Sequence, residues 1–181
     1  MKKFILTGTP GSGKTALIRY LESIGHSVVE EAATDVISLA QACGESTPWM
    51  TPGFIEKVVR LQIQRWEKSY NSTSQYQFFD RSPLCTLALA EYLNCPPPKL
   101  LLDEIDLITR ENVYERSVFF IENLGHCQPT EVRKISFEEA LRFEKIHKAV
   151  YLAHHFELIN ICNQPVPDRA QVVLTAIREG S

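Results

Sequence analysis

The sequence predicts an α/β protein, with one parallel β-sheet covered by helices on both faces. Short apolar runs alternate along the whole chain with segments whose apolar residues recur at helical spacing. This alternation is typical of parallel sheets, because each crossover between strands carries a helix that packs on the sheet. The first apolar run, residues 3–7, ends in a glycine-rich turn before an amphipathic segment, which indicates a buried strand leading into a helix.

Periodicity and turn residues place the individual elements. Five strands are expected, at residues 3–7, 27–30, 75–80, 117–121 and 157–161. Helices are expected at residues 15–23, 32–42, 54–70, 84–93, 100–110 and 136–156, with a last one ending near residue 178. Ser136 and Glu139 have the spacing of a capping box, and Asp168 is the expected N-cap of the last helix. With no internal repeat, linker or low-complexity tract, residues 1–181 are predicted to form a single domain.

Composition narrows the class of protein. With 19 Lys and Arg against 22 Asp and Glu the formal net charge is −3, which gives no reason to expect a nucleic-acid partner. The five cysteines are odd in number and lack metal-ligand spacing, so we expect buried free thiols in a reducing compartment. The N-terminal apolar run stops after Leu6, too short for a signal sequence, and no stretch approaches a membrane span. A cytoplasmic protein is therefore expected.

The turn after the first strand carries the most specific motif. The segment GTPGSGKT matches G-x-x-x-x-G-K-[ST], the phosphate-binding P-loop. Its glycines let successive backbone N–H groups face one phosphate, and the following helix turns its positive end toward the same group. Lys14 would contact the β- and γ-phosphates, and the Thr15 hydroxyl would bind Mg²⁺. The predicted cofactors are ATP (or GTP) and Mg²⁺, with nucleotide contacts at Gly8, Pro10, Gly11, Ser12, Gly13, Lys14, Thr15 and Ala16.

A P-loop enzyme also needs an acidic group at a neighbouring strand end, and two segments compete for that role. The segment LLLDEID contains Asp103 and Glu104, but it follows three prolines and its apolar residues fall at helical spacing. We expect a helix there, with both acids on its solvated face. The segment QFFDRSP fits better, because a half-buried strand ends at Asp80 and Pro83 opens the next helix. Asp80 would hold Mg²⁺ or take the acceptor's proton, and Arg81 would grip phosphoryl oxygens.

At this point the chain resembles a known family. GTPGSGKT, EEA after the second strand and FFDRSP after the third are similar to the small P-loop nucleoside and nucleotide kinases. The closest resemblance is to a bacterial group labelled AAA-type ATPase or predicted kinase, related to nicotinamide riboside kinase domains. The later stretch from VFFIENLG to FEKIHKAVYL also resembles this group, so the similarity covers nearly the whole chain.

The resemblance implies a three-layer fold whose five-stranded parallel sheet has the order 2-3-1-4-5. The third strand would then lie beside the P-loop strand, so that Asp80 approaches the Mg²⁺ bound by Thr15. It also implies a lid-like segment around residues 122–145, in which Arg133 would close over the transferring phosphate. Arg110 and Arg116 are weaker candidates for that contact. By analogy of fold, the loop at residues 163–167 would pass around the adenine.

The same resemblance places a general base after the second strand. Either Glu30 or Glu31 would contact the acceptor hydroxyl, and strand alternation favours Glu31. Trp49 and Met50, in the loop before residue 54, either line the acceptor pocket or pack on the following helix. The predicted activity is transfer of the ATP γ-phosphoryl group to a small nucleoside- or nucleotide-like acceptor. The alternatives are an ATPase or switch acting with a protein partner, and a nucleotide-binding module with little turnover.

Overall fold

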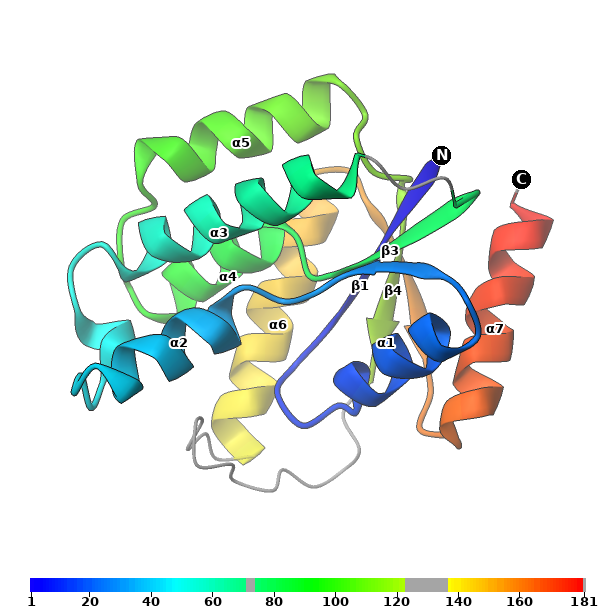
Figure 1. Cartoon of the computed structure of the whole chain (residues 1–181), viewed down its shortest axis with the longest axis horizontal. Helices are drawn as coiled ribbons and strands as arrows, with labels where there is room; N and C mark the ends of the chain where they lie inside the picture. The colour runs from blue at the N-terminus through cyan, green and yellow to red at the C-terminus, as the bar shows by residue number, and fades with distance from the viewer. Residues whose placement is uncertain (71–73, 123–136, 181) are drawn as a thin grey trace.

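The computed structural model describes residues 1–70, 74–122 and 137–180 (Figure 1). Its strands are β1 (Lys2–Gly8), β2 (Ser27–Val29), β3 (Tyr76–Asp80), β4 (Ser117–Ile121) and β5 (Glu157–Ile161). The described helices are α1 (Lys14–Ser23), α2 (Ala33–Ala42), the short 3₁₀ helix η1 (Pro48–Met50), α3 (Phe54–Ser69), α4 (Pro83–Tyr92), α5 (Lys99–Arg110), α6 (Phe137–Ala153) and α7 (Val166–Glu179).

The strands form one parallel sheet in the order β2-β3-β1-β4-β5, as predicted. The central strand β1 pairs with β3 on one side and with β4 on the other. In this register Leu6 lies opposite Asp80, and Gly8 lies opposite Ile121. The carboxyl ends of the three central strands therefore meet at one edge of the sheet, where the loop after β1 begins.

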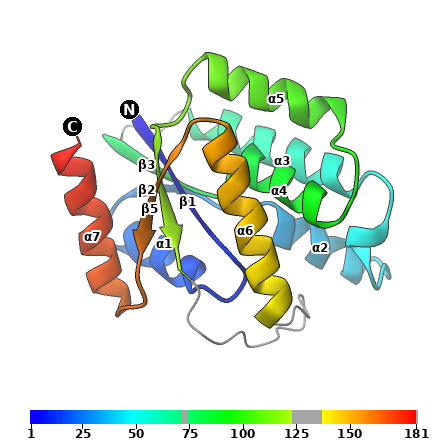
Figure 2. The ribbon, with the colours of Figure 1, turned by 180° about the vertical axis from the view of Figure 1, so that it is seen from behind.

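Helices cover both faces of the sheet. Figures 1 and 2 show α1 and α7 on one side and α3, α4, α5 and α6 on the other. Successive residues of β1 serve opposite faces, because side chains alternate along a strand. Phe4 and Leu6 pack with the core residues of α1 and α7, whereas Ile5 packs with those of the larger layer. Burial on both faces explains why β1, β3 and β4 are almost uninterrupted apolar runs.

Most element boundaries agree with the sequence-based expectations to within a few residues, and two local predictions are wrong. The last helix begins at Val166 after an N-cap at Pro165, so Asp168 lies in its first turn. Pro167 fits the first turn because the N–H groups there have no intrahelical acceptor. The segment around Asp103 is helical as expected, but Glu104 is buried rather than solvated. Glu104 falls three residues after Leu101 and four before Ile108, on the apolar face of α5.

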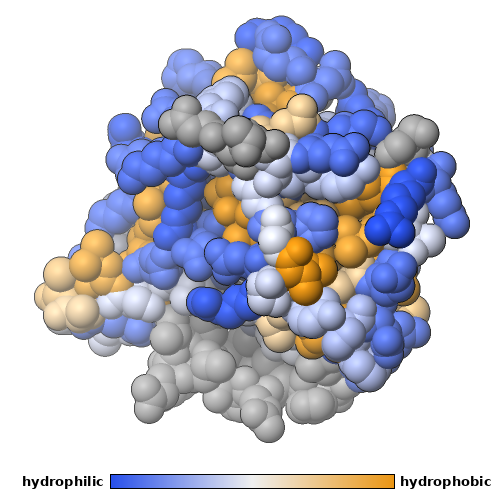
Figure 3. Space-filling model, turned by 45° about the vertical axis from the view of Figure 1, so that its right-hand side comes forward, coloured by the Kyte–Doolittle hydropathy of each residue, from blue (hydrophilic) through white to orange (hydrophobic). Residues whose placement is uncertain are grey.

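The cysteines differ from expectation as well. Cys85 is buried, but Cys43, Cys95 and Cys162 are exposed; all four are free thiols, and Cys127 lies outside the described residues. None of the described helices is long and apolar enough to cross a membrane. On the face seen in Figure 3, polar residues predominate and apolar residues gather in small groups between them.

Candidate functional site

The P-loop connects β1 to α1 and depends on glycine at two positions. A Cβ atom on Gly8 would lie 2.5 Å from the backbone oxygen of Ile121, a contact that would force the loop away from β4. Gly13 has a φ of +76°, and a Cβ there would lie 3.0 Å from Nη1 of Arg169. Both positions therefore reject any larger residue, by close approach and by backbone conformation.

The interior of the loop presents polar groups that suit a phosphate. The hydroxyl oxygens of Thr9 and Ser12 are buried and have no hydrogen-bond partner among the described residues. Helix α1 starts at Lys14 without a side-chain cap, so its first N–H groups also face this loop. Buried polar atoms are normally paired, because an unpaired one costs about 1–3 kcal/mol. A phosphate group bound here would satisfy them.

Lys14 and Asp80 meet at the carboxyl end of the sheet. Their ammonium and carboxylate groups form an ion pair, with side-chain exposures of 5% and 6%. Thr15 follows at the exposed start of α1. Mg²⁺ is usually bound by one or two protein oxygens together with substrate phosphates. The Thr15 hydroxyl and the Asp80 carboxylate supply that donor chemistry, so these residues fit the ion that the fold implies.

Arg81 turns the chain at the end of β3. Its backbone N–H donates to the carbonyl of Leu6 at 2.9 Å, and its φ is +74°. A bulky residue in this region is strained, and such strain collects at functional sites because the surrounding structure must hold it. The guanidinium is buried, with Nε 2.9 Å from Oε1 of Glu31. Burial lowers the pKa of Arg81, but Glu31, Cys85, Asp80 and Tyr151 together outweigh burial and raise that pKa overall.

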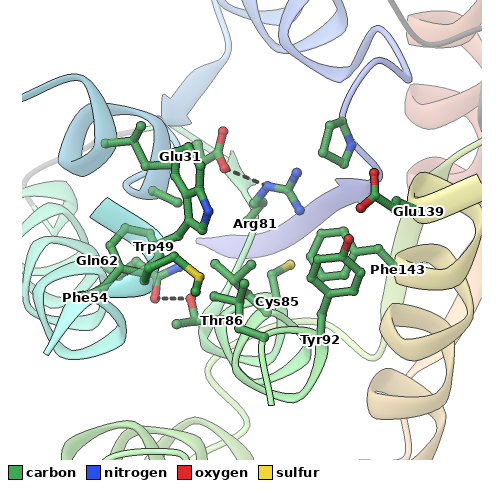
Figure 4. A pocket seen from close by; sticks show the side chains of 16 residues that line it. Glu31, Trp49, Phe54, Gln62, Arg81, Cys85, Thr86, Tyr92, Glu139 and Phe143 are labelled. Atoms are coloured by element: carbon green, nitrogen blue, oxygen red, sulfur yellow. Dashed lines mark hydrogen bonds and ion pairs between the residues drawn. The ribbon is translucent and has the colours of Figure 1, made fainter. Parts of the chain in front are cut away.

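Glu31 and Glu30 lie differently in the junction between β2 and α2. The Glu31 side chain is 12% exposed and accepts a hydrogen bond from Oγ1 of Thr34 at 2.9 Å. It also lines a cavity beside the P-loop. The Glu30 side chain is 57% exposed and lies 3.9 Å from the guanidinium of Arg19. Of the two residues that the sequence left open, the structure brings Glu31 to Arg81 (Figure 4).

A cavity of about 290 Å³ opens beside the P-loop. It lies between η1 and α3 on one side and α4 and α6 on the other (Figure 4). Gln62 and Thr86 are polar groups in an otherwise mainly apolar wall. Thr86 Oγ1 donates to Gln62 Oε1 at 2.9 Å, and Gln62 Nε2 donates to the Ser82 carbonyl at 3.3 Å. The lining residues are Pro10, Glu31, Ala33, Ile37, Trp49, Met50, Phe54, Gln62, Arg81, Cys85, Thr86, Leu89, Tyr92, Leu93, Glu139 and Phe143.

Trp49 and Met50 therefore line the cavity, and Trp49 also packs against the core. Behind the cavity, a buried polar chain ties the helices to β1. The Tyr151 hydroxyl lies 2.7 Å from Ser82 Oγ and 2.9 Å from Cys85 Sγ, which lies 3.1 Å from Thr7 Oγ1. Burial raises the pKa of Tyr151 well above its ordinary value, so the phenol stays protonated. This chain fixes α4 and α6 relative to the P-loop strand.

Two site residues escaped the sequence analysis. His147 is fully buried, and its Nε2 lies 3.3 Å from Nη1 of Arg81. His147 falls four residues after Phe143 in the apolar stripe of α6, so helical spacing could have predicted that it is buried. Arg169 donates to the Ser12 carbonyl at 3.1 Å, the Gln164 carbonyl at 2.6 Å and Asn163 Oδ1 at 3.2 Å. Arg169 thereby joins the P-loop to the loop at residues 163–167, a contact that no local sequence motif predicts.

Other candidates lie elsewhere. Arg110 pairs with Asp106 and Glu111 on the surface of α5. Arg116 immediately precedes β4, at the amino end of the sheet and away from the P-loop edge. Arg133 and residues 123–136 of the lid-like segment lie outside the described residues.

Comparison with known proteins places the fold. Three structures of deoxyadenosine kinase from M. mycoides resemble this chain, each at 13% sequence identity. The structure with products dCMP and a flexible dCDP has a TM-score of 0.57, with 98% of this chain and 99% of that chain covered. The dCTP complex has a TM-score of 0.60, covering 99% and 100%, and the dATP complex has 0.60, covering 98% and 100%. At this identity the likeness shows the P-loop kinase fold.

No curated protein matches the sequence. A family model described as an AAA domain matches residues 3–169, which span the P-loop, Asp80, Arg81 and His147. Since this match covers nearly the whole chain, the protein belongs to that AAA domain family and carries its P-loop on a kinase-like fold.

Proposed function

We propose that the protein is an ATP-dependent kinase that transfers the γ-phosphoryl group to a small nucleoside- or nucleotide-like acceptor. The observation that supports this most directly is the Glu31–Arg81 pair in the wall of the cavity beside the P-loop. A carboxylate and a buried guanidinium thus flank the position where a phosphoryl group from the P-loop would meet a molecule in the cavity. A switch protein has no need of such a cavity.

Each residue takes a role that its position supports. Lys14 and the loop N–H groups would bind the ATP phosphates, with Thr15 and Asp80 holding Mg²⁺, which neutralises charge on the β- and γ-phosphates. Glu31 is the proposed general base, since a base must reach the acceptor hydroxyl, and Asp80 is the alternative. Arg81 would stabilise the charge on the transferring group through its planar fork. Arg133 stays a predicted lid cation.

The cavity also favours a class of acceptor. Among its described lining residues, Arg81 is the single cation, and Glu31 already pairs with it. Aromatic rings of Trp49 and Tyr92 suit a flat ring, while Gln62 offers an amide for hydrogen bonding. We therefore expect an acceptor without a phosphate, such as a nucleoside, to bind better than a nucleotide.

The test is direct transfer of label. Purified protein is incubated with γ-labelled ATP, Mg²⁺ and a panel of nucleosides, deoxynucleosides, nucleotides and vitamins, and labelled product is separated from free phosphate. Transfer to one acceptor above hydrolysis is expected, and Lys14→Ala should abolish it. Lys57→Ala is the matched control, because Lys57 is an exposed residue of α3. Steady hydrolysis that no small molecule alters, but that a protein partner stimulates, would overturn the proposal in favour of a switch.

A further inference from the structure

A buried histidine contacts the guanidinium at the centre of the site. His147 projects from α6, has no exposed surface and packs its ring against Phe143, with centroids 4.3 Å apart at 71°. Its Nε2 lies 3.3 Å from Nη1 of Arg81. Burying a polar ring costs desolvation energy unless the ring is paired, and Arg81 is the partner of His147.

The chemistry of the contact fixes the state of the imidazole. A guanidinium has only donors, so Nε2 must accept the hydrogen bond, and the ring must be neutral. The surrounding charges agree with this. Burial and the positive charges of Arg81 and Lys14 lower the pKa of His147 well below its ordinary value, although the Phe143 backbone and Glu31 act in the opposite direction. At neutral pH His147 is therefore a pure acceptor toward Arg81.

Arg81 is thus held from two sides. Its Nε faces Glu31, from the junction of β2 and α2, and its Nη1 faces His147, from α6. A planar group held at one edge can still rotate about that contact, whereas contacts at two edges define its plane. Nη1 donates to His147 and Nε forms an ion pair with Glu31, so the other N–H groups of the guanidinium suit phosphoryl oxygens.

We propose that His147 is a positioning residue, a neutral acceptor that orients the Arg81 guanidinium for the transferring phosphoryl group. The inference rests on the proposed kinase function. His147 does not itself line the cavity but contacts two residues of its wall, Arg81 and Phe143, so we expect it to act on the chemical step through Arg81 and to leave nucleotide binding alone. Positioning of this kind matters because small misplacements of a catalytic group cost large factors in rate.

The experiment compares two variants that differ in hydrogen bonding. His147→Gln keeps an acceptor near the position of Nε2, whereas His147→Leu fills the site without one. With the acceptor found in the transfer assay, we expect His147→Leu to lower kcat about tenfold, with ATP affinity within twofold of wild type. His147→Gln should stay within threefold in kcat. His154→Leu, just beyond the end of α6, is the matched control and should change neither value.

Other results would overturn the proposal. Equal losses in His147→Leu and His147→Gln, together with weaker ATP binding and a lower unfolding temperature, would show a merely structural residue. An unchanged kcat in a folded His147→Leu protein would remove His147 from the mechanism.

A second measurement needs no acceptor and so separates this inference from the proposed function. In ¹⁵N-arginine-labelled protein, the Arg81 Nε–H signal should be sharp and slow to exchange in wild type and His147→Gln, but broadened in His147→Leu. An unaffected signal in His147→Leu would contradict the positioning role even if no acceptor is ever found. Signals that behave as expected in a protein without kinase activity would support the positioning of Arg81 and count against the proposed reaction alone.

Discussion

The ammonium of Lys14 pairs with the carboxylate of Asp80 in the buried end of the sheet. These are the two groups that we assign to the nucleotide phosphates and to Mg²⁺. Before nucleotide binds, each therefore neutralises the other, and binding of Mg²⁺ and phosphate would exchange these partners. Asp80 ends β3 and Lys14 opens α1, and the two meet because β3 pairs with β1, the strand that leads into the P-loop, with Leu6 opposite Asp80.

Loss of the Lys14 ammonium should weaken ATP binding and lower the stability of the fold. Lys14→Ala removes the phosphate contact and leaves the buried Asp80 carboxylate without its partner. Breaking a buried ion pair in this way costs about 3–5 kcal/mol of unfolding free energy. We expect weak ATP binding by calorimetry and a lower urea midpoint, with Lys57→Ala unchanged in both. A Lys14→Ala protein that binds ATP as tightly as wild type would refute the P-loop assignment.

Loss of the Asp80 carboxylate should reduce ATP turnover more than ATP binding. Asp80→Asn keeps a side chain of the same shape but removes the charge that would attract Mg²⁺. Lys14 remains available to phosphates, so we expect ATP binding to be partly retained while ATP turnover falls about a hundredfold or more. Titration with Mg²⁺ should show that the variant needs a higher concentration. Normal turnover would remove Asp80 from the mechanism.

The two adjacent glutamates provide an internal comparison. Glu31→Gln removes the proposed base beside Arg81, and general base catalysis contributes typically about 10²–10⁴-fold. We expect kcat for phosphoryl transfer to fall within that range. Glu30→Gln changes the same chemistry one residue earlier, on an exposed side chain, and should have no effect. Equal activity of the two variants would exclude Glu31 as the base and leave Asp80.

Local sequence patterns predict some features of the fold and the candidate site but not others. The strands and the P-loop were predictable from local pattern, because buried parallel strands are apolar runs and the P-loop motif is contiguous. The position of Asp80 beside the P-loop followed instead from the strand order that the resemblance to small P-loop kinases implied. Glu104 was misplaced because its charge suggested solvent, whereas the apolar spacing around it placed it inward. His147 and Arg169 were missed as site residues for a different reason: each meets its partner across more than 60 residues, and periodicity carries no information about such pairings.

The neutral state of His147 should appear in the pH dependence of stability. Its pKa is lowered in the folded protein, so below the ordinary value of about 6.5 the unfolded chain binds a proton that the native chain does not. Stability must then fall as pH decreases from that point, by up to about 1.4 kcal/mol per pH unit for one group, until the folded pKa is reached. His26 and His154 also have lowered pKa values and add to the slope, so the informative quantity is a difference between variants. Urea unfolding of wild type and His147→Gln between pH 7 and pH 5 should show a shallower loss in the variant, because its amide does not titrate. Parallel curves would mean that His147 takes up its proton over the same pH range in the folded and unfolded chains, which would contradict its role as a neutral acceptor for Arg81.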